Sequence, residues 1–525
     1  MNASHLLDIA ARTDFFVLHK RGGITFPPVI CPALSRVFST GIEKVIPGMN
    51  YDPLLYIYHR GKTTVLLPRI KFEKTGDAAL SMLKKDPMMV AAYRKKFLAK
   101  CDGFIRYMQS MDKGLRKAAD EDLLKYYGDY ILLYFDACML GEPIALALDE
   151  PLSACLRGLL SDRIGDKKQA EKMATLLMTP TQSSFLAQEE EDIRKIAKQV
   201  RSSGMSFIFR KNEDEICKTL AKFPSVKKRI TAHTKRYYWV PYDYLGEVWT
   251  EKDFITRIKE ILKQERKSPQ MSDLKRQQKA AFASLLQKGI LSQGDKKLFL
   301  AAQDAAILLD VKKEKLTQVH FYANRLVREV ARRRDVDFNK IIFLLEEEFK
   351  ALIQWKFDAG SLEDRSKGST YFCMNYQIYR LGKKETDFIL KHCIRSMMSK
   401  EICGLAASPG VVLGRVRVVP SPKDCASLVK GEILVAGMTT PSYALAIRKA
   451  SGIITDEGGI TCHASIVSRE MGIPCIVGTK NATKVLKTGD LVELDGEAGS
   501  VRRITSKEDR PQKQRHLRHQ PKKFS

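Results

Sequence analysis

Residues 455–478 read TDEGGITCHASIVSREMGIPCIVG, and this stretch decides the fold of the C-terminal part of the chain. A β-branched run that ends at Thr455 predicts a strand. Gly458 and Gly459 allow the backbone to turn tightly and to approach a ligand closely. Apolar residues then recur at helical spacing from Ile460 to Met471, before a second apolar run. The pattern therefore predicts strand, glycine turn, helix and strand in succession.

A histidine, His463, falls in the first turn of the predicted helix, and Thr461 is placed to cap it. Free amides and the positive end of the helix dipole favour an anion at that position. Neutral imidazole has a pKa near 6.5, so it is a competent nucleophile at about pH 7. His463 lies off the apolar stripe and is expected to face outward. Its phosphate would lie among the hydroxyls of Thr461 and Ser465, beside the turn at Gly458 and Gly459.

The structural alternative for His463 is a hydrogen-bonded histidine near a turn, and for a lone histidine that alternative would be preferred. The position of His463 at a predicted helix N-terminus suits a phosphate acceptor. Cys462 is expected to be a small packed residue, because adjacent residues on a helix point apart and do not form a nucleophile pair.

Short β-branched runs alternate with glycine and proline throughout the C-terminal segment, which predicts a compact α/β module. The predicted strands are 416–419, 433–436, 452–455, 474–477, 491–494 and 500–504, and the predicted helices are 441–450 and 462–471.

This segment resembles the phosphohistidine swivelling domain of the phosphoenolpyruvate-utilising enzymes, such as phosphoenolpyruvate synthase, pyruvate phosphate dikinase and rifampicin phosphotransferase. The resemblance rests on the Thr-x-His signature at 461–463, on ASPGVVLG at 407–414 and on the turns at 487–490 and 495–499. It implies that residues 401–504 form a mobile domain in which His463 carries phosphate between two sites. Thr461 matches a position that can be regulated by phosphorylation in dikinases.

The rest of the chain predicts a multidomain α+β protein. Residues 1–75 form a mixed α/β segment with a hairpin around Arg60, and residues 76–400 form a mainly helical linker or substrate-like domain. The α/β phosphohistidine swivelling domain follows at 401–504. Residues 505–525 are basic and almost without apolar residues, which predicts a disordered tail.

The helical domain more weakly resembles the substrate or linker region of rifampicin phosphotransferase. In that light Arg325 and Arg328 are candidates for holding a phosphorylated or acidic substrate, since guanidinium groups fork onto oxyanions. A solvated helix face explains such arginines equally well. The aromatic residues between Tyr237 and Tyr244 either line a substrate pocket or form a core cluster, and the core cluster is the preferred interpretation.

A phosphate donor site is missing from the sequence pattern. No glycine-rich phosphate loop of the G-x-x-x-x-G-K type is present, and the tail after Ile504 is too short for a barrel of roughly 250 residues. We therefore expect an ATP-grasp protein to act in trans, with ATP and Mg²⁺ on that partner and no cofactor on this chain alone. The eleven cysteines form no C-x-x-C pair, so no metal site is predicted.

Net charge is +28, which permits binding to nucleic acid, but the basic residues are spread along the chain and favour an ordinary solvated surface. No apolar run of roughly 20 residues and no signal peptide is evident, so a cytoplasmic protein without a membrane partner is expected.

The sequence thus predicts a phosphotransferase component that is incomplete without its partner and passes phosphate from His463 to an unknown small-molecule acceptor. The alternative is a non-catalytic binding or regulatory protein that retains the swivelling-domain fold.

Overall fold

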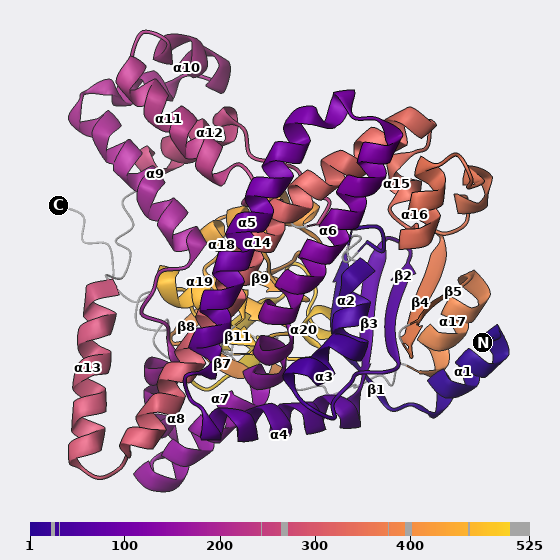
Figure 1. Cartoon of the computed structure of the whole chain (residues 1–525). Helices are drawn as coiled ribbons and strands as arrows, with labels where there is room; N and C mark the ends of the chain where they lie inside the picture. The colour runs from indigo at the N-terminus through magenta and orange to yellow at the C-terminus, as the bar shows by residue number, and fades with distance from the viewer. Residues whose placement is uncertain are drawn as a thin grey trace.

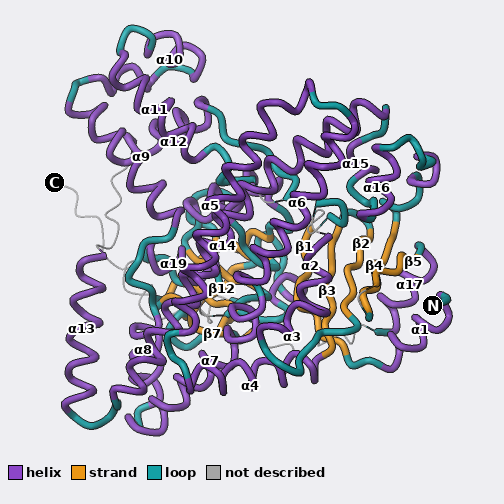
Figure 2. Tube along the Cα trace, in the orientation of Figure 1, coloured by secondary structure: helices purple, strands orange, loops and turns teal. Residues whose placement is uncertain are grey.

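The computed structural model describes residues 1–22, 27–30, 32–242, 244–263, 271–375, 377–393, 402–459 and 462–504. Figure 1 shows an N-terminal sheet on one side, a body of long helices, a projecting helical bundle and C-terminal strands behind the long helices. The strands fall into two separate groups (Figure 2). The predicted fold class is therefore confirmed, with a mainly helical N-terminal and central region followed by a C-terminal domain of mixed strands. The predicted basic tail, 505–525, lies outside the described residues.

The N-terminal sheet is antiparallel, and its strand order is β1-β3-β2-β4-β5. The predicted hairpin at Arg60 and Gly61 is confirmed, since β2 and β3 pair on either side of these two residues, both of which have positive φ. Alternate residues of β2 face opposite sides, as the strand period requires. Leu55 and Ile57 pack under the terminal helices α1 and α17, whereas Tyr56 and Tyr58 join the core of the helical body. The elements are β1 (Phe15–Gly22), β2 (Leu54–His59), β3 (Lys62–Pro68), β4 (Gly368–Met374), β5 (Gln377–Leu381), α1 (Ala3–Arg12) and α17 (Lys383–His392).

Strands β4 and β5 come from a part of the chain that the sequence predicted to be mainly helical. Strand β4 adds to the edge of β2, and β5 pairs with β4, so residues more than 300 positions apart share one sheet. The N-terminal segment is consequently completed by residues from the far end of the helical region.

The helical body is built around one long helix, α14 (Gln293–Arg334), which packs along α5 and crosses α6 and α7. Its Ser292 cap and the Asp295 carboxylate form a capping box at the first turn. The other main helices of the body are α4 (Arg69–Lys85), α5 (Met89–Gly114), α6 (Asp120–Gly141), α7 (Pro143–Ile164), α8 (Lys167–Met178) and α13 (Met271–Gln287). Their buried faces form one continuous apolar core with the inner face of the N-terminal sheet.

A smaller bundle projects from the body at the upper left of Figure 1. It consists of α9 (Phe185–Ser202), α10 (Glu213–Leu220), α11 (Pro224–Tyr237) and α12 (Glu251–Lys263). Its apolar cluster is shared with the C-terminal domain and is separate from the core of the body. Tyr237 and Trp239 are buried in this cluster, and Tyr242 is buried against Phe321 of α14, so the core interpretation of the aromatic run is confirmed.

The C-terminal domain contains eight strands in the order β6-β13-β12-β8-β9-β10-β11-β7. Strands β8 to β11 run parallel to one another, and the remaining pairings are antiparallel. The strands are β6 (Ile402–Cys403), β7 (Leu405–Ser408), β8 (Val411–Val418), β9 (Ile433–Ala436), β10 (Gly452–Thr455), β11 (Cys475–Val477), β12 (Leu491–Asp495) and β13 (Ser500–Arg503). The helices are α18 (Ala444–Lys449), α19 (His463–Met471) and α20 (Ala482–Val485). All six strands predicted for this segment are present, to within a few residues at their ends.

The remaining helical elements are short. They are α2 (Pro32–Arg36), α3 (Ile42–Val45), α15 (Phe338–Ile341) and α16 (Glu346–Ile353), a π-helical turn at Val37–Gly41, and 3₁₀ turns at Leu115–Lys117, Met205–Arg210, Ala359–Leu362, Pro422–Ser427 and Pro441–Tyr443.

One segment of the described residues, Asp120–Ile164, is long and apolar enough to cross a membrane by length and composition alone. In the structure it is two helices, α6 and α7, separated at Glu142, and 56% of the apolar window is buried inside the protein. It therefore has the character of a core segment.

The close crossing of α4 and α7 at Gly76 generates a prediction. A Cβ at Gly76 would lie 2.6 Å from Cγ of Pro151 and 3.2 Å from the carbonyl oxygen of Ala147. Because α7 cannot retreat without disturbing the core, we expect Gly76→Ala to destabilise the protein by about 1–3 kcal/mol in urea unfolding. Gly128→Ala on α6 is the matched control, since no atom lies within 4 Å of its new methyl group. It should stabilise the protein by up to about 1 kcal/mol. Equal effects of the two substitutions would contradict the packing argument.

Candidate functional site

His463 lies in the first turn of α19, as the sequence predicted; it is the first residue of the helix, and the N-cap is Cys462. The cap residue has extended backbone and makes no side-chain cap hydrogen bond. The expected cap, Thr461, lies outside the described residues, and the helix begins one residue later than a Thr461 cap requires. The imidazole is thus attached where the first-turn amides and the positive end of the helix dipole favour an anion.

The expectation that His463 faces outward is wrong, because its exposed fraction is only 3%. Helix α19 packs on β7 and β11 with one side and contacts α9 and α14 of the helical regions with another. The apolar stripe predicted from the sequence accounts for the packing of α19 on the strands. It does not account for the contacts of α19 with α9 and α14. The imidazole is therefore buried in this structure.

A threonine fixes the orientation of the imidazole. Nδ1 of His463 lies 3.1 Å from Oγ1 of Thr439, which is itself buried in the loop after β9. The sequence analysis did not identify Thr439. The available signal was its place just after a predicted strand, where side chains of a parallel sheet gather at one edge.

The glycine turn that precedes the histidine is held closed by its own side chains. Gly458 has φ +110°, and a Cβ there would lie 2.6 Å from Sγ of Cys462, so a side chain does not fit. Ser465 donates its hydroxyl hydrogen to the carbonyl oxygen of Gly459 over 2.7 Å. In this conformation Ser465 supports the turn, which is a different task from the phosphate binding expected of it.

Below the turn, Asp456 anchors the loop to the next helix. It accepts hydrogen bonds from the amide of Thr483, over 2.9 Å, and from the Thr483 hydroxyl. The loop is therefore fixed to α20 where it leaves β10.

A carboxylate from the helical body reaches the tip of this turn. A Cβ on Gly459 would lie 2.8–2.9 Å from the carboxylate atoms of Asp149 on α7, so only glycine permits this approach. Burial raises the pKa of the Cys462 thiol, Asp149 adds to the rise, and hydrogen bonds with Ser465 and the charge of Lys313 on α14 oppose it. A thiol with a raised pKa is a poor nucleophile, which agrees with the packing role predicted for Cys462.

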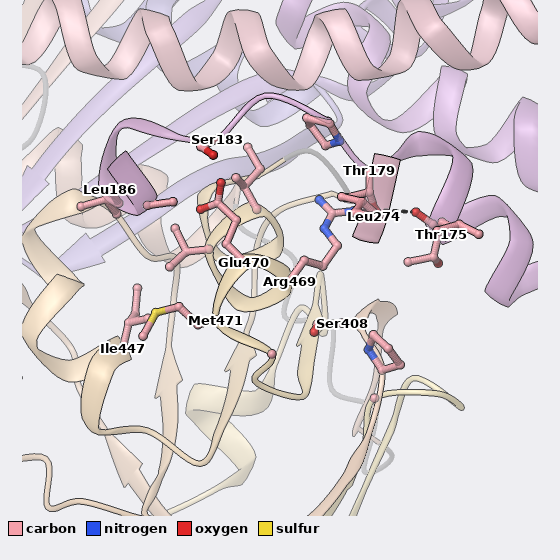
Figure 3. Close-up of a pocket in the computed structure, with 18 of the residues that line it drawn as sticks. Thr175, Thr179, Ser183, Leu186, Leu274, Ser408, Ile447, Arg469, Glu470 and Met471 are labelled. Carbon is pink, nitrogen blue, oxygen red and sulfur yellow. Dashed lines mark hydrogen bonds between the residues drawn. The ribbon is translucent and has the colours of Figure 1, made fainter. Parts of the chain in front are cut away.

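The start of α9 receives two carboxylates from different parts of the chain. The Ser184 amide donates to Oε1 of Glu470 over 2.6 Å, and the Ser184 hydroxyl donates to Oε2 of the same residue. The next amide, of Phe185, donates to Oδ2 of Asp310 over 3.1 Å. Figure 3 shows Glu470 turned toward this segment, while Arg469 points away from it. Burial raises the pKa of Glu470 to about 7 and the pKa of Asp310 well above its usual range.

A second polar contact joins α18 of the C-terminal domain to α9. Arg448 donates to Glu189 over 2.6 Å and to Glu190 over 2.8 Å, and Arg257 of α12 binds the same two carboxylates. Although burial acts in the opposite direction, the guanidinium groups of Arg257 and Arg448 lower the pKa of Glu189 to about 2. The C-terminal domain is thus held to the bundle by an ionised network.

The two arginines proposed as substrate ligands lie elsewhere. Arg325 pairs with Asp112 of α5, and the guanidinium of Arg328 lies 3.7 Å from the ring centroid of Phe338. Along α14 they lie about 18 Å or more beyond Lys313, at 1.5 Å per residue. The structure therefore does not bring them together with His463. Among the described residues, no group of three or more histidine, cysteine, aspartate or glutamate side chains is arranged to hold a metal ion.

Comparison with known proteins places the site in a recognised domain. Residues 428–499 match the model of the family described as "PEP-utilising enzyme, mobile domain". A probable phosphoenolpyruvate synthase of Methanothermobacter thermautotrophicus is 47% identical over 134 residues, which are 26% of this chain and 19% of that protein. A probable phosphoenolpyruvate synthase of Archaeoglobus fulgidus is 55% identical over 108 residues, which are 20% of this chain and 14% of that protein.

An uncharacterised phosphotransferase of Bacillus subtilis, YvkC, is 41% identical over 100 residues, which are 19% of this chain and 12% of its own length. The matched part of the chain thus spans less than a fifth of each of these relatives. An NMR structure of Enzyme I covers 62% of this chain and 83% of its own, with 15% identity and a TM-score of 0.17, and that likeness carries no argument. The C-terminal domain therefore contains a phosphohistidine mobile domain related to those of phosphoenolpyruvate synthase-type phosphotransferases.

The raised pKa of Glu470 generates a pH prediction. A carboxyl group whose pKa is higher in the folded protein stabilises the fold at low pH and loses that contribution as the pH rises through the folded pKa. We therefore expect stability to fall by about 1–3 kcal/mol between the ordinary value of 4.5 and about pH 7. Glu470→Gln keeps a hydrogen-bonding side chain but does not titrate, so it should flatten this decline in urea unfolding at a series of pH values.

The matched control is Glu191→Gln, which changes an exposed carboxylate of α9 that pairs with Lys195. Its profile should follow that of the wild type. If Glu470→Gln also follows the wild type, the contact between Glu470 and Ser184 does not titrate as argued.

Proposed function

We propose that this protein, whose C-terminal domain contains the mobile domain of the phosphoenolpyruvate-utilising enzymes, is a phosphotransferase component that carries a phosphoryl group on His463. The observation that carries the proposal is the histidine at the first position of α19, inside the family match, with its ring oriented by Thr439. A helix start supplies amides for the phosphate oxygens without any further ligand. On sequence grounds Thr461, Gly458 and Gly459 belong to the same site.

The hydrogen bond to Thr439 selects which nitrogen reacts. With Nδ1 facing the Thr439 hydroxyl, Nε2 is the nitrogen that we expect to accept the phosphoryl group. In loading, the Nε2 lone pair forms the P–N bond while the P–O bond to the donor's leaving group breaks. In delivery, an acceptor atom forms the new bond to phosphorus, and the electron pair of the P–N bond returns to Nε2.

Loading requires the buried His463 to become accessible to the donor. Asp149 of α7 lies at Gly459 of the turn, and Lys313 of α14 acts electrostatically on the neighbouring Cys462. In this proposal a phosphoryl group on His463 is repelled by Asp149 and attracted by Lys313, so the docked position suits delivery as well as release. The return to the body would then present the phosphoryl group to an acceptor held there.

The donor in this proposal is an ATP-grasp protein that binds ATP and Mg²⁺ and acts in trans in the cytoplasm. The choice of donor rests on the sequence, in which no glycine-rich phosphate loop is recognised. The acceptor in this proposal is a small molecule. Arg325 and Arg328 are not acceptor ligands in this proposal. Arg325 pairs with Asp112, Arg328 lies over the ring of Phe338, and both are far along α14 from Lys313.

The burial of His463 also favours a second candidate, a non-catalytic binding protein in which the mobile domain is docked permanently. The two candidates differ in whether His463 ever accepts phosphate. One labelling experiment separates them.

Phosphate incorporation is the first test. Purified protein is incubated with labelled ATP or labelled phosphoenolpyruvate, with and without lysate of the source cells. We expect acid-labile label that appears only with lysate and is lost in His463→Ala, because the P–N bond of phosphohistidine is labile in acid and the donor site is on a partner. His392→Ala, which removes an exposed histidine outside the site, should retain full labelling. Folded protein that takes up no His463-dependent label under any of these conditions would favour the binding protein.

Thr439→Val tests the orientation of the ring. Valine keeps the shape of threonine but cannot hydrogen-bond Nδ1, so the imidazole loses its preferred tautomer and orientation. We expect the initial rate of His463 labelling to fall about 10- to 100-fold, with little change in thermal stability. Thr439→Ser restores the hydroxyl and should recover most of the rate. Labelling that is equal in Thr439→Val and the wild type would show that the hydrogen bond does not matter for transfer.

A further inference from the structure

Two carboxyl groups from opposite sides of an interface meet at the start of α9. Glu470 belongs to α19 of the C-terminal domain, and Asp310 belongs to α14 of the helical body. They accept hydrogen bonds from consecutive backbone amides, those of Ser184 and Phe185, over 2.6 and 3.1 Å. Amides in the first turn of a helix point the same way, so the two carboxyl groups that they bind are neighbours.

The groups around Asp310 leave it short of positive charge. Burial and then the Glu470 carboxylate raise its pKa, and Glu314, one turn further along α14, raises it again. The opposing effect of Lys313 is smaller than that of either acid. Lys315 lies 3.6 Å from the Glu314 carboxylate and 3.1 Å from that of Asp102 on α5. Charges on the neighbouring elements are therefore already shared with other acids.

The groups around Glu470 likewise do not neutralise it. Arg469 lowers its pKa less than burial raises it, and Figure 3 shows the guanidinium pointing away from the Glu470 carboxyl group. The described residues of β7 and β11, on which α19 packs, contribute one titratable group, the buried thiol of Cys475, whose pKa burial raises. On α9 the nearest acid, Glu190, is bound by Arg448.

Water can reach this pair without any movement of the domains. Glu470 lines a cavity of about 1100 Å³ between the two halves of the protein (Figure 3). A water molecule needs only about 30 Å³, so a cavity of this size with polar walls admits water. Protons can therefore exchange between Glu470 and the solvent while the domain stays docked.

We propose that Glu470 and Asp310 share one proton in the docked protein and together form a pH-sensitive latch between the two halves. When the proton passes to water, two carboxylates face each other across the interface. Their repulsion then separates the C-terminal domain, with the α9–α12 bundle, from the helical body. The inference does not depend on phosphate transfer, because neither carboxyl group takes part in it.

The direction of the pH dependence follows from which arrangement binds the proton more tightly. In the docked protein the pKa of Glu470 is raised to about 7 and that of Asp310 well above its usual range. Separation brings Asp310 into water and away from Glu470, so both pKa values fall toward their ordinary range. The docked form therefore binds more protons, and docking weakens as the pH rises through about 7. Each proton released can raise the ratio of open to docked protein up to about tenfold per pH unit.

Energy transfer between two dyes in the full-length protein tests the latch. Azidophenylalanine replaces Lys96 on α5 and Lys423 in the C-terminal domain, both exposed, and carries dyes whose emission does not depend on pH. We expect the transfer efficiency to change as the pH rises from about 5 to about 8.5, with its midpoint near the raised pKa of Glu470, about 7. Far-ultraviolet circular dichroism should stay constant over this range, which separates opening from unfolding.

Two neutral variants should each hold the latch closed. Asp310→Asn keeps an oxygen for the Phe185 amide, and Glu470→Gln keeps one for the Ser184 amide, but each leaves at most one negative charge at the helix start, where a single charge is stabilised. Both variants should keep the low-pH transfer efficiency up to about pH 8.5. The control Glu191→Gln removes an exposed carboxylate from the same helix and should follow the wild type.

Either of two outcomes would overturn the latch. One is a constant transfer efficiency in the folded wild type across the whole pH range. The other is a change in Asp310→Asn and Glu470→Gln that has the same midpoint and amplitude as in the wild type, because opening would then depend on other groups. Both outcomes are independent of whether His463 accepts phosphate.

Discussion

The amides at the start of α9 hold the two halves of the protein together. Ser184 binds Glu470 of the C-terminal domain, and the neighbouring Phe185 amide binds Asp310 of the helical body. Helix starts have amides without internal partners, so these carboxylates satisfy groups that would otherwise need water. One turn later the same helix supplies Glu189 and Glu190 to Arg448. These contacts of α9 therefore set where the C-terminal domain lies against the helical regions.

Much of the C-terminal domain could be predicted from the sequence because its signals are local. The β-branched runs, the glycine turn at Gly458 and the helix that begins at His463 each depend on residues within about ten positions of one another. The orientation of His463 could not be predicted, since Thr439 lies 24 positions away on another loop. The contact between Ser184 and Glu470 joins residues 286 positions apart, and no periodicity records such a pairing. Strand β4 was missed for the same reason, because its partner β2 lies more than 300 positions earlier.

The arginine-rich end of α14 shows why charge in a sequence is a weak guide to binding. Arg332 and Arg333 bind Glu329 within the same helix, and Arg334 donates to the Leu352 carbonyl oxygen at the end of α16. These contacts tie the last turn of α14 to its neighbours and neutralise part of the basic run. Arginines that look like an anion site in the sequence are, in the fold, mainly structural.

The distribution of apolar and polar contacts indicates where the protein can open. The α9–α12 bundle and the C-terminal domain share one apolar cluster, so their separation would expose buried hydrocarbon. The contacts described between the helical body and α19 with its preceding turn include polar ones. Arg469 donates to Thr179, and Asp149 lies near Gly459. Polar contacts exchange for water at a smaller net cost than apolar ones. The arrangement thus favours movement of the C-terminal domain and the bundle as one unit away from α7 and α14. In such a movement Glu470 would keep its bond to Ser184, and Asp310 would lose its bond to Phe185.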